Sequence, residues 1–369
     1  MHIQCRIEDS AVFFRVDSST EQGSGHLMRC LTLATELSKY QIAVVFISRE
    51  FINNSIELIK EYGFDVVTFG VENDEMSVLS VDGAFELEDA RRVYHVVDAS
   101  AASNKLVVLD SYYLGFEWEQ FVRSPEIKVL VIDDLKSRSH SCDLFLDFNF
   151  QDKSAQLRGS RLSDGCVKML GPKYSLVRKE FADMRGIALK KRKFPKKKNI
   201  LVCMGGSDPD NDTGKVLIGF LRSKFIESIK INVVIGFGNP NKKELEVLCG
   251  GHKNIVLHIQ TAHMAKLMAE ADFAITAGGT TTWERCVLGL PSLVVVQSDD
   301  QLPGTIALDR MGAHKCLGYA SDISSDAYLE SFSKVTHSEL LAMSEMSKDI
   351  CDGNGAARVS EQIFNILKK

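Results

Sequence analysis

The chain has 369 residues, of which 45% are hydrophobic and 25% charged. That balance is typical of an ordinary globular protein and excludes a disordered or collagen-like chain. The net charge of -5 gives no general attraction for nucleic acid or for an anionic membrane surface. Because 369 residues are many for one hydrophobic core, two domains are expected.

The cellular setting is predicted from three features that the sequence lacks. The opening MHIQCRIEDS has no basic stretch followed by an apolar run, and no apolar segment approaches the ~20 residues needed to cross a bilayer. The nine cysteines are scattered and form no CxxC pair, which favours reduced, mostly buried thiols. We therefore expect a cytoplasmic monomer with no membrane or nucleic-acid partner.

Short apolar runs divide the first half of the chain, as in parallel strands that are covered on both faces. The predicted strands of this half cover residues 11–17, 43–48, 64–69, 105–110, 128–133 and 143–148. Between the first two, apolar residues recur at helical spacing: Leu27, Cys30, Leu31, Ala34 and Leu37. The pattern predicts strands alternating with helices.

The pattern is interrupted by KKRKFPKKK, residues 190–198, which predicts a solvated linker, with a nucleic-acid or lipid tether as the alternative. Strands then resume at residues 199–205, 231–236, 254–259, 273–278 and 291–297. We expect two doubly wound, Rossmann-like parallel-sheet domains, residues 1–189 and 199–369, facing a central cleft where ligands bind. The last helix, around residues 355–368, is expected to cross back onto the first domain.

The first strand leads into the loop SSTEQGSGH, which contains Gly23 and Gly25 and places His26 on the first turn of a helix. Glycines let backbone approach a ligand, and the positive end of the helix dipole disfavours a protonated imidazole. His26 is therefore a candidate general base that takes a proton from water, with Asp17 as the candidate to orient it. The alternative is that His26 only caps the helix.

Two glycine-containing turns of the second half are candidate ligand loops. In CMGGSDPDND, Gly205, Gly206 and Ser207 offer backbone amides and a hydroxyl, while the neighbouring Asp208 argues against a tight phosphate cradle. A plain turn before a helix is the alternative. Gly236, in IGFGNPN, could let a nucleotide base lie against backbone, and a simple turn explains it equally well.

The segment ITAGGTTTWERCVLGLPSLVV is the most informative. Gly278 and Gly279 end a strand, and three threonines follow at a helix start: Thr280, Thr281 and Thr282. Amides and hydroxyls in this position bind diphosphate, and Glu284 could accept hydrogen bonds from ribose hydroxyls. An N-cap cluster is the alternative.

Other chemistry is not indicated by the sequence. No Walker loop, HExxH or zinc-type spacing of histidine and cysteine occurs, so no cofactor or metal is expected. The remaining histidines are isolated, and His95, His140 and His252 are interpreted as surface or capping residues.

Several strings together resemble the UDP-sugar hydrolases of pseudaminic acid biosynthesis, the PseG family, from about residue 11 to about residue 315. They are RVDSSTEQGSGHLMRCLTLA, VIDDLKSRSHSCDLFLDFN, GPKYSLVRKEF, ILVCMGGSDPDN, VVIGFGNPN and AITAGGTTTWERCVLGLPSLVV. The resemblance implies a GT-B-like fold similar to MurG. It also implies metal-independent, inverting hydrolysis of UDP-2,4-diacetamido-2,4,6-trideoxy-β-L-altropyranose to UDP and the free sugar, which is a step toward the glycosylation of proteins such as flagellin.

The resemblance assigns roles to particular residues. His26 matches the family's catalytic base, and Tyr112 matches a tyrosine that contacts sugar or phosphate. Arg29, in the same matching string as His26, is expected to bind the substrate. The threonine loop and Glu284 match the nucleotide site. Two positions depart from the family: Ser111 replaces a histidine, and Asp300-Gln301 replaces Asn-Gln, so the identity of the sugar is less defined than the reaction.

Three alternatives remain open from the sequence. A GT-B glycosyltransferase that uses a UDP-N-acetylated sugar would show the same pattern of strands and loops. A UDP-sugar 2-epimerase and a binding module without activity are also compatible with it.

Overall fold

The computed structural model describes residues 9–19, 25–71, 83–135, 138–149, 162–194, 196–206 and 208–368. The chain divides into two compact units. The first comprises Met1–Leu176 together with Asn354–Lys369, and the second comprises Val177–Gly353. Each unit is an α/β domain built on its own parallel sheet.

The sheet of the first unit has seven strands in the order β3-β2-β1-β4-β5-β6-β7, all paired in parallel. The strands are β1 (Ser10–Val16), β2 (Ala43–Arg49), β3 (Asp65–Phe69), β4 (Asn104–Asp110), β5 (Ile127–Ile132), β6 (Leu144–Asp147) and β7 (Val167–Leu170). The helices of this unit are α1 (Gly25–Leu37), α2 (Ile56–Glu61), α3 (Gly83–Asp98), α4 (Phe116–Val122) and α13 (Gly355–Leu367).

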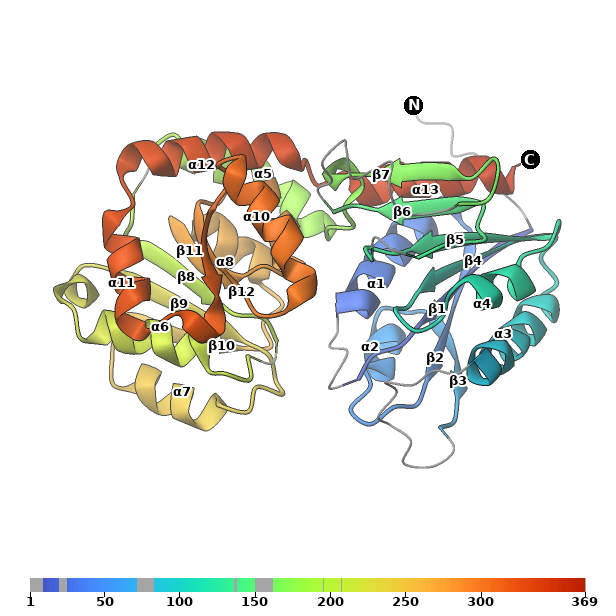
Figure 1. Cartoon of the computed structure of the whole chain (residues 1–369), viewed down its shortest axis with the longest axis horizontal. Coiled ribbons are helices and arrows are strands. Elements are labelled where there is room, and N and C mark those ends of the chain that lie inside the picture. Colours follow the sequence, from blue (N-terminus) through green and yellow to red (C-terminus); the bar gives the residue numbers. More distant parts are fainter. Residues whose placement is uncertain are drawn as a thin grey trace. The chain divides into compact units, whose positions relative to one another are not determined.

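Helices cover this sheet because its strands are apolar on both faces. Phe13, Val107 and Val129 pack with residues of α3 and α4, among them Val93 and Trp118. In Figure 1, α3 and α4 lie together on one side of the sheet, and α1 lies on the other side.

The last helix, α13, belongs to the first unit although it follows the whole second unit in sequence. It contacts α1 and β4, and the ring of Phe364 lies 5.3 Å from that of Tyr40. Its apolar residues Val359, Ile363 and Leu367 are buried at helical spacing.

The second sheet has six parallel strands in the order β10-β9-β8-β11-β12-β13. The strands are β8 (Asn199–Cys203), β9 (Lys230–Ile235), β10 (Ile255–Ile259), β11 (Phe273–Ala277), β12 (Ser292–Val296) and β13 (Lys315–Tyr319). The helices are α5 (Lys179–Arg192), α6 (Asp212–Leu221), α7 (Lys242–Gly250), α8 (Met264–Glu270), α9 (Thr281–Val287), α10 (Leu302–Arg310), α11 (Ser325–Lys334) and α12 (His337–Ile350).

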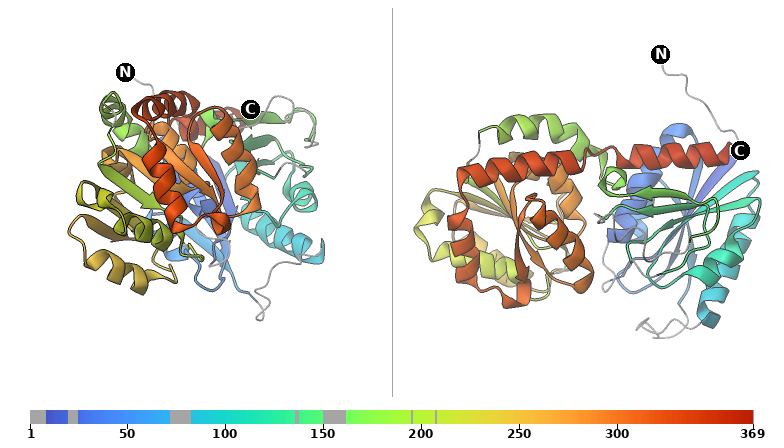
Figure 2. Two further views of the ribbon diagram at one scale, coloured as in Figure 1. Left: turned by 60° about the vertical axis from the view of Figure 1, so that its left-hand side comes forward. Right: turned by 45° about the horizontal axis from the view of Figure 1, so that its top comes forward.

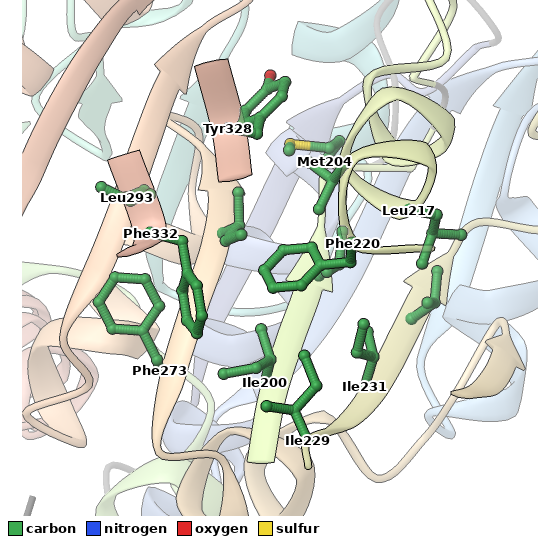
Figure 3. Close-up of a cluster of buried hydrophobic side chains, with 14 of the residues drawn as sticks. Ile200, Met204, Leu217, Phe220, Ile229, Ile231, Phe273, Leu293, Tyr328 and Phe332 are labelled. Atoms are coloured by element: carbon green, nitrogen blue, oxygen red, sulfur yellow. The ribbon is translucent and has the colours of Figure 1, made fainter. Parts of the chain in front are cut away.

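A large apolar cluster joins one face of this sheet to α6, α7 and α11. Figure 3 shows Ile200 and Phe273 of neighbouring strands meeting Phe220 of α6 and Phe332 of α11, whose rings lie 4.9 Å apart. On the other face α5 packs against α8 and α9, and the two views of Figure 2 show α5 and α12 running close to each other. Both faces of the sheet are therefore buried.

The boundary between the units differs from the expected linker at residues 190–198. Helix α5 includes Arg192, whose guanidinium is buried and donates to the carbonyls of Met268 and Ala271. Lys197 donates to the carbonyls of Phe332 and Val335. Because basic side chains of this segment bind backbone of the second unit, the segment belongs to that unit, which begins at Val177.

Candidate functional site

The candidate site of the first unit lies where β1 and β4 end. These strands are neighbours in the sheet and run parallel, with Val16 opposite Asp110. The carboxyl ends of parallel strands share one edge, and helix α1 starts there shortly after β1. The topology thereby brings His26 to Asp110 across 84 residues of sequence.

His26 is oriented by a buried carboxylate. Its Nδ1 lies 2.6 Å from Asp110 Oδ1, and the His26 side chain is 14% exposed while that of Asp110 is fully buried. Because an ionised carboxylate only accepts hydrogen bonds, Nδ1 carries the proton and donates it. Nε2 forms no hydrogen bond to a described residue, which leaves it as the acceptor atom of the ring.

Arg29 holds this carboxylate from the other side. One turn after His26 on α1, it donates from Nε and Nη2 to the two Asp110 oxygens, each at 2.5 Å. Burial alone would raise the pKa of Asp110, but the charges of Arg29 and His26 outweigh burial and hold it well below its ordinary value. Asp110 therefore stays ionised.

Tyr112 lies on the turn after β4, with its ring edge-on to His26 at 4.6 Å between centroids. Burial and a hydrogen bond to Asp134 raise the pKa of the Tyr112 hydroxyl far above its ordinary value. Tyr112 is therefore a neutral hydrogen-bonding group at neutral pH and cannot act as a base.

Asp17 does not make the expected contact with His26. Its carboxylate accepts from Arg15 Nη1 at 2.6 Å and from the Arg49 backbone N–H at 2.8 Å. The residue that orients His26 is Asp110. The sequence does not single out Asp110, because Asp110 lies in a different strand from His26 and ends an apolar run like any other strand end.

Two of the expected ligand residues, Gly23 and Ser207, lie outside the described residues. Gly25 is the first residue of α1.

The glycines that follow β8 and β9 bring two turns into close contact. Gly205 has φ +90°, a conformation that favours glycine. A Cβ on Gly236 would lie 2.3 Å from the carbonyl oxygen of Gly206, so a larger residue would separate the turns. Asp208 is buried and accepts from the backbone N–H groups of Asp212 and Thr213. Its carboxylate therefore pairs with the first backbone N–H groups of α6.

The loop after β11 packs on the start of α10. A Cβ on Gly278 would lie 2.3 Å from Thr305 Oγ1, and Gln301 lies next to both Gly278 and Gly279. Thr280 is exposed and Thr281 half-buried, whereas Thr282 is buried. Asp300 is exposed and forms no hydrogen bond with a described residue. Of the three threonines, only Thr280 and Thr281 thus present side chains to solvent.

Glu284 is paired with Arg178, a residue that the sequence did not single out although it lies in GPKYSLVRKEF. Arg178 Nη2 donates to Glu284 Oε1 at 3.1 Å. Burial raises the pKa of Glu284, and Arg178 partly offsets that effect. The pair leaves Oε2 of Glu284 as a hydrogen-bond acceptor.

Arg285 is a second residue that the sequence did not single out. It is 2% exposed and donates from Nη2 to Thr282 Oγ1 at 3.1 Å, while its Nε has no hydrogen-bond partner. It forms no ion pair with a described carboxylate, and burial lowers its pKa to about 10 although the nearby charge of Glu284 acts to raise it. A buried cation with no described carboxylate in direct contact thus lies beside Thr282 of the threonine loop.

His140 does not lie at the surface as expected. It is 1% exposed and contacts two buried carboxylates. Within the described residues, no group of three or more histidine, cysteine or acidic side chains could hold a metal ion. None of the described helices combines the length and the apolar character needed to cross a bilayer.

The chain is similar in sequence to one domain family and to several known proteins. Residues 200–318 match the glycosyltransferase family 28 C-terminal domain. The chain is 26% identical over 279 residues to the UDP-2,4-diacetamido-2,4,6-trideoxy-beta-L-altropyranose hydrolase of Campylobacter jejuni, covering 75% of this chain and 88% of that protein. It is 28% identical over 292 residues to an uncharacterised protein of Methanocaldococcus jannaschii, covering 77% of this chain and only 55% of that protein, about half its length.

Solved structures share the architecture. MurG of Acinetobacter baumannii superposes with a TM-score of 0.67 at 15% identity, covering 96% of this chain and 99% of MurG. UDP-GlcNAc 2-epimerase of Neisseria meningitidis gives a TM-score of 0.61 at 13% identity, with 96% and 99% covered. The fold is GT-B-like. This confirms the predicted pair of Rossmann-like parallel-sheet domains.

Proposed function

We propose that this protein hydrolyses a UDP-linked sugar, with His26 as the general base. The observation that carries the proposal is the 2.6 Å contact between His26 Nδ1 and Asp110. It fixes the tautomer of the ring and leaves Nε2 to accept a proton from water. Arg29 keeps Asp110 ionised and in place.

The substrate is inferred from the relatives. The Campylobacter jejuni protein is named for a UDP-diacetamido-trideoxy sugar, and the alignment covers 88% of it. The strings around His26, Tyr112 and Glu284 resemble the same hydrolase family. The proposed substrate is therefore UDP-2,4-diacetamido-2,4,6-trideoxy-β-L-altropyranose, and the products are UDP and the free sugar.

In the proposed reaction, water attacks the anomeric carbon while Nε2 of His26 takes its proton. A bond forms from the water oxygen to C1, the bond from C1 to the diphosphate oxygen breaks, and UDP leaves as an anion. The imidazolium formed is stabilised by Asp110, as in a catalytic triad. General-base help of this kind is worth ~10²–10⁴-fold, and direct attack by water inverts the anomeric centre.

The nucleotide is assigned to the second unit. Backbone amides of Gly205, Gly206 and the Gly278–Thr281 loop would bind the diphosphate, with the buried charge of Arg285 beneath. Gly236 would let the base approach the backbone, while Gln301, next to Gly278 and Gly279, and its neighbour in sequence Asp300 would face the sugar.

Glu284 would bind the ribose hydroxyls. Hydrogen bonds to a charged group are worth about 1.5–3 kcal/mol, so Glu284→Ala should raise the Kd for UDP by ~10-fold to ~100-fold. Isothermal titration with UDP measures this change, and an unaltered Kd would remove Glu284 from the nucleotide site.

A glycosyltransferase that uses a UDP-N-acetylated sugar is the second candidate. It is favoured by the match of residues 200–318 to a glycosyltransferase family 28 domain and by the likeness to MurG. A transferase would need an acceptor alcohol in place of water.

One NMR experiment separates the candidates. The protein is incubated with the UDP-diacetamido sugar and no acceptor, in water enriched in ¹⁸O or in D₂O. Hydrolysis predicts free sugar of inverted configuration with ¹⁸O on C1. An inert mixture that turns over only with an acceptor supports transfer, deuterium at C2 supports epimerisation, and UDP binding without turnover supports a binding module.

A further inference from the structure

His140 lies in the segment between β5 and β6 and is enclosed by charge. Its Nδ1 lies 2.8 Å from Oε1 of Glu119, on α4, and its Nε2 lies 2.9 Å from Oδ2 of Asp133, just after β5. The side chains of all three residues are essentially unexposed. Nδ1 donates to Glu119, whereas Nε2 and Asp133 Oδ2 form a close ion pair with no hydrogen bond between them. With a carboxylate beside each nitrogen, the ring is an imidazolium.

The charges of this cluster balance only when His140 is protonated. Glu119 also accepts from the Ser141 backbone N–H at 2.6 Å, and Asp133 accepts from that of Leu135 at 2.7 Å. Arg138 is the other cation, with Nε 3.3 Å from Asp133 Oδ2. Two carboxylates therefore face two cations. Burial lowers the pKa of His140, but Asp133 and Glu119 outweigh burial and raise it to about 9.

Arg138 connects this cluster to the candidate site. Its Nη1 donates to the carbonyls of Ser111 at 3.2 Å and Tyr112 at 3.0 Å, and its Nη2 donates to the carbonyl of Leu114. One guanidinium thus binds three carbonyls of the turn that follows β4. That turn begins directly after Asp110 and carries Tyr112, whose ring lies against His26.

We infer that His140 is a positioning residue for the proposed hydrolysis. Its charge keeps Asp133 in place, and Asp133 in turn pairs with Arg138. Arg138 then fixes the Ser111–Leu114 turn, which places Tyr112 beside His26. Only the expected effect on kcat rests on the proposed function. The contacts that lead from His140 to the Tyr112 ring can be tested whether or not that function is correct.

The kinetic test is His140→Gln, which removes the positive charge. Misplacement of a catalytic group by about 1 Å costs up to ~10²-fold in rate, so kcat should fall by ~10-fold to ~100-fold. KM and the Kd for UDP should not change, because the second unit is untouched.

Arg138→Lys keeps the positive charge but loses the planar guanidinium that donates to three carbonyls, so it should lower kcat similarly. The matched control is His258→Gln. Among the described residues the His258 ring hydrogen-bonds Asn232 alone, in the second unit, so this change should leave kcat unchanged.

The pH profile is a readout that a merely structural role would not move. The wild-type kcat should fall as pH rises through about 9, where His140 loses its proton. This alkaline limb should be absent from His140→Gln. A variant that keeps both the wild-type kcat and the alkaline limb would overturn the inference.

NMR separates this inference from the proposed function, and its first measurement uses the wild type and so does not depend on a folded variant. In the wild type, ¹⁵N-labelled His140 should show two protonated nitrogens at pH 7, and a neutral ring would overturn the inference. In His140→Gln, the Tyr112 and His26 ring resonances should shift, and unmoved resonances would also overturn it. If they shift while the wild type hydrolyses no UDP-sugar, the proposed function fails and the contact chain stands.

Discussion

Two buried arginines, one in each unit, meet opposite conditions. Arg29 donates twice to Asp110, and although burial acts to lower its pKa, Asp110 holds that pKa well above the ordinary value. Arg285 is also buried, hydrogen-bonds the Thr282 hydroxyl alone among the described residues, and has a pKa that burial lowers to about 10. The first cation is paired directly with a carboxylate, whereas the second has Glu284 only as a nearby charge that acts to raise its pKa.

The second unit holds another buried arginine, Arg192, whose pKa burial also lowers to about 10 and whose Nε is likewise unpartnered. Arg192 donates to two carbonyls at the end of α8, whereas Arg285 donates to one hydroxyl. A neutralised cation orients its neighbours, whereas an uncompensated one favours an anion. Under the proposed function, the first unit is built for proton transfer and the second for binding a diphosphate.

The largest effect is expected at the proton acceptor. His26→Asn should lower kcat by ~10²–10⁴-fold because the general base is lost, while UDP binding, assigned to the other unit, remains. Steady-state assay and UDP titration on the same sample measure both. Normal turnover in this variant would end the role of His26, and weakened UDP binding would break the division between the units.

A pair of aspartate variants tests which carboxylate serves His26. Asp110→Asn should lower kcat by ~10²-fold or more because the tautomer is no longer fixed. It should also cost about 3–5 kcal/mol of stability because Arg29 loses its main anion. Asp17→Asn should show no comparable loss of kcat, since Asp17 bonds Arg15 and Arg49. The reverse ranking would restore Asp17 as the orienting group.

The strands and the overall fold could be predicted from the sequence. The GT-B-like fold was predictable because buried parallel strands leave continuous apolar runs, and every segment expected as a strand is one. β13 was missed because it is half-buried throughout and contains Gly318. β7 was missed because its first two residues, Val167 and Lys168, are exposed.

The partners of the site residues could not be predicted in the same way. A glycine loop before a helix marks His26 locally, but its contact with Asp110 depends on β1 lying beside β4 in the sheet. Proximity in sequence instead suggested Asp17. His140 lies in the polar string KSRSHSCD, so it looked exposed, yet carboxylates from α4 and the end of β5 enclose it. Such contacts are set by tertiary packing.

Acid should weaken the first unit through its paired charges. Asp89 is buried, and although burial acts to raise its pKa, Arg15 and Arg49 lower it to about 2. A depressed pKa contributes stability above the unfolded value of about 3.9, and that stability is lost as pH falls toward 2. The loss should be about 2 kcal/mol by urea unfolding between pH 5 and pH 2. Asp89→Asn should lack this part of the acid dependence, and an unchanged pH profile would show that the pairing is not formed.

The smallest effect concerns Arg285, which has no described carboxylate in direct contact. Replacing a buried charge by an apolar side chain of similar length is often neutral or stabilising, so Arg285→Met should leave the free energy of unfolding unchanged or higher. Arg29→Met leaves the buried Asp110 carboxylate without its main cation and should lower the free energy of unfolding.

If Arg285 serves a diphosphate, its variant should weaken UDP binding by about 10-fold, or about 1.4 kcal/mol. Binding of uridine, which carries no phosphate, should be unaffected. Equal destabilisation by the two substitutions would mean that Arg285 is neutralised within the fold, and unaltered UDP affinity would mean that its charge serves packing alone.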